Sequence, residues 1–414
     1  MPGMSSMRWM VIRNEMRHLL GTSFWVVLSL SLGFVFCMNL AMYDQIPTDE
    51  AHHDLASYGP YVSQSTITGF KREADRLEPV VSKDLMALGP QAVQLGVKNY
   101  QSARDLVDSV ESSRWTNPSV LNTDRGKLTG RINALPSYRR LVHCHDVMDA
   151  YRGCNREALT ARAEKQLRKG GSNGIELPES VTKRLDILSG QCRAGMGLAA
   201  PELLDYTQSN FRLSVYMVPL LAALVVVAPR LVKDQVHGVR QTQLTTRTGR
   251  ILPGLQVFAM VCAGLLMMLM VAAGSFLMWV PKIAGLQDLP VFDGHALPWF
   301  TWSLGEYLAV FVLLCLGSAF LVFLLVLWIS MHCRTYTRLV LLAVPVVLLA
   351  VHVFVAWLLV DPCCIGSVVT RIVPLPGIEL YLILGLLVLT LCLCWWSARK
   401  LCCLGDLNER KINE

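Results

Sequence analysis

The chain has 414 residues, of which 53% are apolar and 17% are charged, and its formal net charge is +7. Soluble domains contain roughly 25% charged residues, so this composition excludes an ordinary soluble globular enzyme. The apolar residues are concentrated in a few long runs, whereas residues 44–212 have the composition of a soluble protein. The sequence therefore predicts a polytopic membrane protein with one large polar insertion.

Six apolar runs are long enough to be membrane spans, because about 20 apolar residues are needed to cross roughly 30 Å of hydrocarbon. Backbone polar groups must be paired within lipid, so each run is expected to be a helix. The first run is longer than the apolar core of a signal peptide and no small-residue cleavage site follows it, so we expect it to be retained. The predicted spans are residues 23–43, 213–232, 254–280, 308–329, 339–360 and 380–396.

The charge of the connecting segments predicts their side of the membrane, because basic segments favour the cytoplasm. Residues 1–22, 229–253, 330–338 and 397–414 together carry a net charge of +9, and the rest of the chain carries −2. We therefore expect a multi-pass protein of the plasma membrane with both termini in the cytoplasm. The inner segments are then residues 1–22, 233–253, 330–338 and 397–414, and the outer ones are residues 44–212, 281–307 and 361–379.

The insertion at residues 44–212 contains 22 basic and 21 acidic residues. This balance is unlike a nucleic-acid-binding surface, so we expect no nucleic-acid partner. In residues 102–113 and 179–188, apolar side chains recur every three or four positions with charges between them, which predicts amphipathic helices. The predicted fold is therefore an all-α polytopic membrane protein with six transmembrane helices and a large, mainly helical extracytoplasmic domain between spans one and two.

Three cysteines lie in the insertion, and an extracytoplasmic compartment permits disulfides. Cys144 could pair with Cys154, or either of them with Cys192. The third cysteine would then remain unpaired within the domain, or bridge to Cys363 or Cys364 in the last outer loop. The sequence leaves this connectivity open.

The run from His143 to Asp146 contains two histidines, a cysteine and an aspartate, which are all possible metal ligands. On a helix, however, positions 143 and 145 point about 200° apart, and no second ligand pair with metal-binding spacing accompanies them. We therefore expect a disulfide cysteine flanked by exposed histidines, with no metal site. No catalytic motif is present either, so we expect the chain not to be an enzyme.

Two polar segments on the predicted inner side carry the functional signal. In residues 7–20, Trp9, Ile12 and Met16 share one helical face while Arg13 and Arg17 lie off it, which is typical of a helix lying along the membrane surface. Residues 233–253 are polar, rich in threonine and arginine, and longer than a connection between two spans requires.

These segments resemble those of the membrane permease subunits of ABC exporters of the second class. In that family an acid and a glycine follow span two, a short helix crosses the cytoplasmic face, and a hydroxyl- and arginine-rich stretch leads into span three. The family's proline after the hydroxyl pair is replaced here by arginine. The residues that the resemblance assigns to ATPase coupling are Asp234, Gly238, Gln241, Thr245, Thr246, Arg247 and Arg250, and those of the connecting helix are Arg13, Glu15 and Arg17.

The resemblance implies that residues 233–253 form a coupling helix that docks on a cytoplasmic ABC ATPase. The chain has no GxxxxGK[ST] phosphate-binding loop, so ATP and Mg would be bound by that partner and the chain itself would hold no cofactor. Because six spans are half of the usual twelve, a second permease copy or a paralogue is also implied, and membrane lipids surround the spans.

Two functions follow from the resemblance, and the sequence leaves both open. The first is a permease that moves a hydrophobic or amphipathic substrate outward. The second is a non-transporting subunit that transmits ATPase motion to its outer domain to regulate or anchor an external partner. For residues 233–253 alone, a solvated basic loop that serves only membrane orientation is the simpler alternative.

Overall fold

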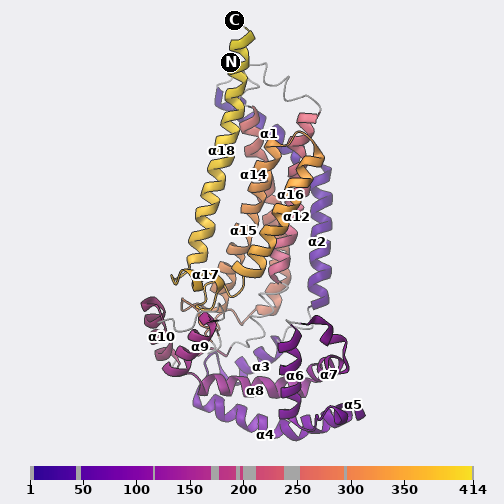
Figure 1. Cartoon of the computed structure of the whole chain (residues 1–414), viewed down its shortest axis with the longest axis vertical. Helices are drawn as coiled ribbons and strands as arrows, with labels where there is room; N and C mark the ends of the chain where they lie inside the picture. The colour runs from indigo at the N-terminus through magenta and orange to yellow at the C-terminus, as the bar shows by residue number, and fades with distance from the viewer. Residues whose placement is uncertain are drawn as a thin grey trace.

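The computed structural model describes residues 4–42, 48–114, 117–168, 177–192, 196–198, 211–236, 252–292 and 296–412. A bundle of long helices runs along the molecule, and a group of shorter helices covers one end of it (Figure 1). In the described ranges the chain is all-helical, with only isolated β-bridges besides the helices. Six of the helices are long and apolar enough to cross a membrane, which confirms the prediction of a multi-pass, all-helical membrane protein.

The six long helices match the predicted spans in order. They are α2 (Thr22–Met42), α12 (Arg212–Val236), α14 (Leu252–Ile283), α15 (Leu304–His332), α16 (Tyr336–Val353) and α18 (Ile378–Ile412). Helix α15 begins four residues before the predicted span because Ser303 and Glu306 form a capping box. Helix α16 ends at Val353 and continues as one π-helical turn, Phe354–Leu358. Most of the segment predicted as a C-terminal tail is helical, as part of α18.

Helices α12, α14 and α15 form the centre of the bundle. Half or more of the residues in their apolar segments are buried, whereas only 6% are buried in α16. Side-chain hydrogen bonds join α15 to its neighbours: Ser330 Oγ donates to the Ala228 carbonyl on α12 at 2.9 Å, and Trp328 Nε1 donates to Ser397 Oγ on α18 at 2.9 Å. Such bonds stabilise helix association where the surrounding lipid offers no polar partner.

Helices α14 and α15 approach closely at Gly264. A Cβ atom at Gly264 would lie 2.2 Å from Cζ of Phe323, whose side chain is almost fully buried. We expect Gly264→Val to destabilise the bundle by about 1–3 kcal/mol, because the almost fully buried ring would have to shift within a packed core. Thermal denaturation of the purified protein would show this as a lower Tm. Gly385→Val on α18 is the control, since nothing lies within 4 Å of that position, and an equal loss in both variants would contradict the packing explanation.

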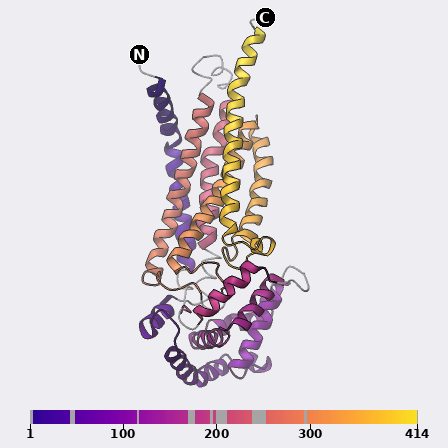
Figure 2. The same cartoon turned by 90° about the vertical axis from the view of Figure 1, so that its left-hand side faces the viewer.

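The shorter helices form a domain, and those between residues 64 and 152 share a hydrophobic core of their own. They are α3 (Thr48–Tyr58), α4 (Gln64–Ala87), α5 (Pro90–Gln94), α6 (Tyr100–Arg114), α7 (Asp124–Asn133), α8 (Pro136–Arg152), α9 (Arg156–Arg168) and α10 (Glu179–Gln191), with a 3-10 turn at Pro118–Asn122. The two predicted amphipathic segments lie in α6 and α10. The turned view shows this domain as a layer across one end of the bundle (Figure 2). We refer to that end as the domain end and to the opposite one as the far end.

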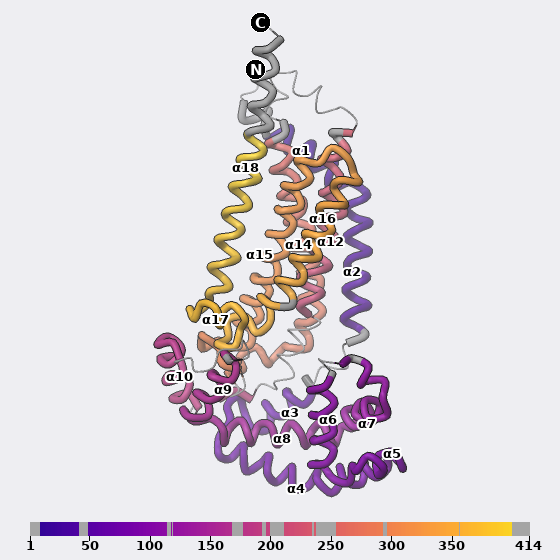
Figure 3. The backbone as a smooth tube through the Cα atoms, viewed as in Figure 1, coloured from indigo at the N-terminus to yellow at the C-terminus, as the bar shows by residue number. Residues whose placement is uncertain are grey.

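The first helix, α1 (Met4–Leu19), lies at the far end and packs against α14. The described end of α12 and the start of α14 lie there too (Figure 3). Helix α1 and the two described boundaries of residues 233–253 therefore lie at the same end of the bundle, away from the domain.

Candidate functional site at the two ends of the bundle

A buried ion-pair network fixes α3 to the rest of the domain. The side chain of Asp54 on α3 is fully buried, and Arg140 on α8 donates to both its carboxylate oxygens, at 2.8 and 2.6 Å. The same guanidinium donates to both oxygens of Glu73 on α4, at 2.9 and 2.8 Å. His143 Nε2 lies 2.9 Å from the second oxygen of Asp54. One arginine thus joins three helices through two bidentate contacts.

The network keeps its charges despite burial. Burial alone would raise the pKa of Asp54, but hydrogen bonds from His143 and Arg140 outweigh it and lower that pKa to about 2. Burial would likewise lower the pKa of Arg140, yet hydrogen bonds to Asp54 and Glu73 raise it overall. Because Asp54 is ionised, it accepts a hydrogen bond from His143. Arg140 also lies over the ring of Phe70, 5.6 Å from its centroid.

Helix α3 contacts the bundle as well as the domain. Ala51 is buried in the hydrophobic core of the bundle, and Leu55 packs against that core. On the same helix, Tyr58 packs against the core of the domain. Since α3 is also the first helix after α2 in the chain, it connects the first span to the domain both covalently and by packing.

A second connection is made by backbone hydrogen bonds between four short segments, which we call the junction seam. It consists of residues 60–62, 196–198, 289–292 and 302–304. Gly197 N donates to the Phe292 carbonyl at 2.7 Å, and Val291 N donates to the Trp302 carbonyl at 3.0 Å. The seam therefore runs from the domain, through the connection between α14 and α15, to the first turn of α15.

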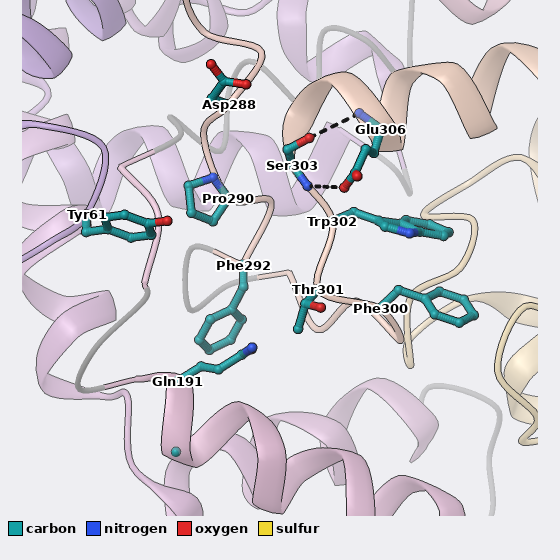
Figure 4. A pocket seen from close by; sticks show the side chains of 11 residues that line it. Tyr61, Gln191, Asp288, Pro290, Phe292, Phe300, Thr301, Trp302, Ser303 and Glu306 are labelled. Carbon is teal, nitrogen blue, oxygen red and sulfur yellow. Dashed lines mark hydrogen bonds between the residues drawn. The ribbon is translucent and has the colours of Figure 1, made fainter.

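A pocket of about 650 Å³ opens beside the junction seam (Figure 4). Its walls come from Tyr61 in the domain, from Gln191 at the end of α10, and from the chain between Asp288 and Glu306. Aromatic rings and two carboxylates make up much of the lining. The Glu306 carboxylate accepts from the backbone N–H of Ser303 at 3.0 Å, which caps α15.

The helical hairpin α9–α10 makes the third connection. Cys154, just before α9, and Cys192, just after α10, form a disulfide. Hydrophobic side chains of the hairpin share a small core with Leu297 and Trp299, which precede α15, and with Ile365, which precedes α18. Arg184 on α10 donates to the Pro298 carbonyl at 2.9 Å. The hairpin therefore covers two of the connections between long helices.

The Cys154–Cys192 disulfide is one of the pairings that the sequence left open, and Cys144 is a free, fully buried thiol. Burial raises the pKa of Cys144 to about 12, so the thiol is protonated and unreactive. The expectation of a disulfide at Cys144 between exposed histidines is wrong, because α8 turns His143 and Cys144 into the domain core. Among the described residues no group of three or more side chains could hold a metal ion.

The far end contains the residues of the predicted connecting helix. Glu15 on α1 accepts a hydrogen bond from Gln256 Nε2 near the start of α14 at 3.3 Å, whereas Arg13 and Arg17 are exposed. Asp234 lies on the last turn of α12, and its side chain is not described. The remaining predicted coupling residues lie outside the described ranges; they are Gly238, Gln241, Thr245, Thr246, Arg247 and Arg250.

The residues that sequence reasoning missed are those of the domain end. Asp54 and Glu73 lie 86 and 67 positions from Arg140, so no local pattern links them. Comparison of the chain with models of protein families, with characterised proteins and with solved structures finds no match. The function must therefore be argued from the geometry of the chain itself.

Proposed function

We propose that the chain is the membrane permease subunit of an ABC exporter, which moves a hydrophobic or amphipathic substrate outward using a separate ATPase. The observation that carries the proposal is the contrast between the two ends of the six-helix bundle. The far end holds α1 beside the boundaries of the predicted coupling segment, and the domain end holds the pocket. This arrangement suits a protein that is moved by a partner at one end and binds a ligand at the other.

The contact between Glu15 and Gln256 supports the coupling role. It joins α1 to α14 shortly after the predicted coupling segment, while the other boundary of that segment is the end of α12. A movement of residues 233–253 would therefore act on α1, α12 and α14 together. Transporters convert the rigid-body motion of a partner into helix movement through connections of this kind.

In this proposal the far end faces the cytoplasm and the domain is extracytoplasmic, at the plasma membrane. The basic charge of the segments at the far end favours that orientation. The ATPase binds ATP and Mg, and the chain holds no cofactor. Only 6% of the residues in the apolar segment of α16 are buried, which leaves a face of this helix for a second permease copy or for lipid.

A second candidate function is transmission of ATPase motion to the domain without transport. The three connections at the domain end favour it: α3 with its buried ion pairs, the junction seam, and the disulfide-closed hairpin. Any movement of α2 or α15 would be passed to the domain through them. The two candidates differ in whether a substrate crosses the membrane.

Co-purification with a candidate ABC ATPase from the same genome tests the proposal. We expect the wild type to retain the ATPase. The double variant that combines Asp234→Ala with Arg247→Ala should retain at least tenfold less ATPase. The matched control is Asp149→Ala with Arg152→Ala, which removes an exposed ion pair of the same residue types from the domain and should retain the wild-type amount. If no ATPase co-purifies with the wild type, both candidate functions fail. If it does, efflux of substrate from proteoliposomes separates export from transmission.

A further inference from the structure

The pocket at the junction seam has features that indicate the chemistry of its ligand. Its volume of about 650 Å³ falls within the range of roughly 300–1,000 Å³ that is common for small-molecule sites. Its walls come from both the domain and the connection before α15, so a bound molecule would touch the two parts at once (Figure 4). The seam fixes these walls through backbone hydrogen bonds, which makes the pocket largely preformed.

Aromatic side chains supply the apolar part of the lining. Phe300 and Trp302 stack with their ring centroids 4.6 Å apart. Phe292 is nearly fully buried beneath the pocket, whereas about half of the surface of Tyr61 is exposed. Aromatic rings attract cations placed against their faces, with tryptophan the most effective, and they also pack against alkyl and aryl groups.

Among the described lining residues, the charged side chains are all negative. Asp288 and Glu306 are the ionisable carboxylates, and the described lining residues include no lysine, arginine or histidine. Glu306 is engaged with the N-terminus of α15 through the Ser303 N–H, but Asp288 makes no hydrogen bond or ion pair with any described residue. An anion here would meet carboxylates with no cationic side chain among the described lining residues, whereas a cation would be attracted by both carboxylates and rings.

We propose that this pocket binds a lipophilic organic cation, such as a quaternary ammonium or phosphonium carrying aryl or alkyl groups. The inference deepens the proposed export function and rests on it for its biological meaning, since the pocket would then be the subsite from which substrate leaves the bundle. Asp288 and Glu306 supply the attraction for charge, and Trp302 with its neighbouring rings supplies the apolar contact.

The probe is tetraphenylphosphonium, with tetraphenylborate as an anion of the same shape. Binding of each to the purified chain in lipid nanodiscs, without ATPase, is measured by equilibrium dialysis against empty nanodiscs. We expect the wild type to bind the phosphonium at least tenfold more tightly than the borate. Asp288→Asn with Glu306→Gln should weaken phosphonium binding at least tenfold, and the glutamine retains the ability to cap α15.

The matched control is Asp149→Asn with Glu179→Gln, which removes two exposed carboxylates elsewhere in the domain and should leave binding unchanged. Trp302→Leu should weaken the binding of the phosphonium while keeping the carboxylates. Formation of the Cys154–Cys192 disulfide and a monodisperse elution profile establish that each variant is folded. Three results would overturn the proposal. They are no binding of the phosphonium to the wild type, equal affinity of the wild type for both probes, and an affinity of the Asp288→Asn, Glu306→Gln variant for the phosphonium equal to that of the wild type.

The outcomes also separate this inference from the proposed function. If the chain binds the phosphonium but recruits no ATPase, the exporter proposal fails and the cation site remains. If it recruits the ATPase but binds no phosphonium, the cation site is wrong and the exporter proposal remains.

Discussion

Replacing Arg140 by leucine is expected to lower the free energy of unfolding of the helical domain by about 3–5 kcal/mol, because removing one partner of a buried ion pair leaves an uncompensated charge. The change would leave the carboxylate of Asp54 fully buried without its bidentate donor, and would separate Glu73 from it. Hydrogen exchange followed by mass spectrometry of α8 peptides reports the domain separately from the spans. A change of this size corresponds to an increase of about two to four orders of magnitude in exchange rate.

Two further variants make this prediction specific. Arg152→Leu on the same helix removes an exposed arginine whose contact with Asp149 is 3.6 Å long, and we expect it to change exchange little. Combining Arg140→Leu with Asp54→Asn removes the buried charge as well and should recover part of the lost protection. Equal effects of Arg140→Leu and Arg152→Leu would show that the network does not hold α3 in place.

The same network predicts a pH dependence of domain stability. Folding lowers the pKa of Asp54 from its ordinary value of 3.8 to about 2, since hydrogen bonds from His143 and Arg140 outweigh the cost of burial. The ionised carboxylate therefore stabilises the domain fully above about pH 4, and this contribution is lost as the pH falls towards 2. We expect the protection of α8 amides, corrected for intrinsic exchange, to fall over that interval in the wild type. In the Arg140→Leu variant the fall should be smaller, and an unchanged fall would contradict the assignment.

Gly197→Ala is expected to separate the domain from the bundle at the junction seam. A Cβ atom there would lie 2.2 Å from the carbonyl oxygen of Pro290, which is backbone and can move only if the seam opens. Such overpacking costs about 1–3 kcal/mol, and losing the bond from Gly197 to Phe292 adds about 1 kcal/mol. Gly130→Ala on α7 is the control, because nothing lies within 4 Å of that position.

Hydrogen exchange of peptides spanning residues 289–292 measures the opening directly. We expect faster exchange in Gly197→Ala and unchanged exchange in Gly130→Ala. Under the exporter proposal, Gly197→Ala would retain the ATPase while efflux falls, because the coupling end is intact and the connection at the domain end is not. Normal seam protection in Gly197→Ala would show that the close contact with Pro290 relaxes without cost.

The number, order and helical nature of the long helices could be predicted from the sequence. Span length is set by the thickness of the hydrocarbon core of the membrane. An apolar run in lipid must pair its own backbone N–H and C=O groups by hydrogen bonds, which a helix does, so local composition is sufficient for this inference. Periodicity likewise placed helices at residues 102–113 and 179–188, because a helix that packs on one face repeats every 3.6 residues. The earlier start of α15 depends on a capping box at Ser303 and Glu306 that is also a local signal.

The domain end could not be predicted in the same way, because its contacts join positions far apart in the chain. Asp54 and Arg140 meet only after α3 and α8 pack together, and Gly197 is constrained by Pro290 from a separate connection. The sequence by itself determined which segments are apolar enough to span a membrane and which are amphipathic, since those properties depend on neighbouring residues. Only the tertiary structure decided which cysteines pair, which carboxylates Arg140 binds and where the pocket forms, because only packing brings these distant groups within bonding distance.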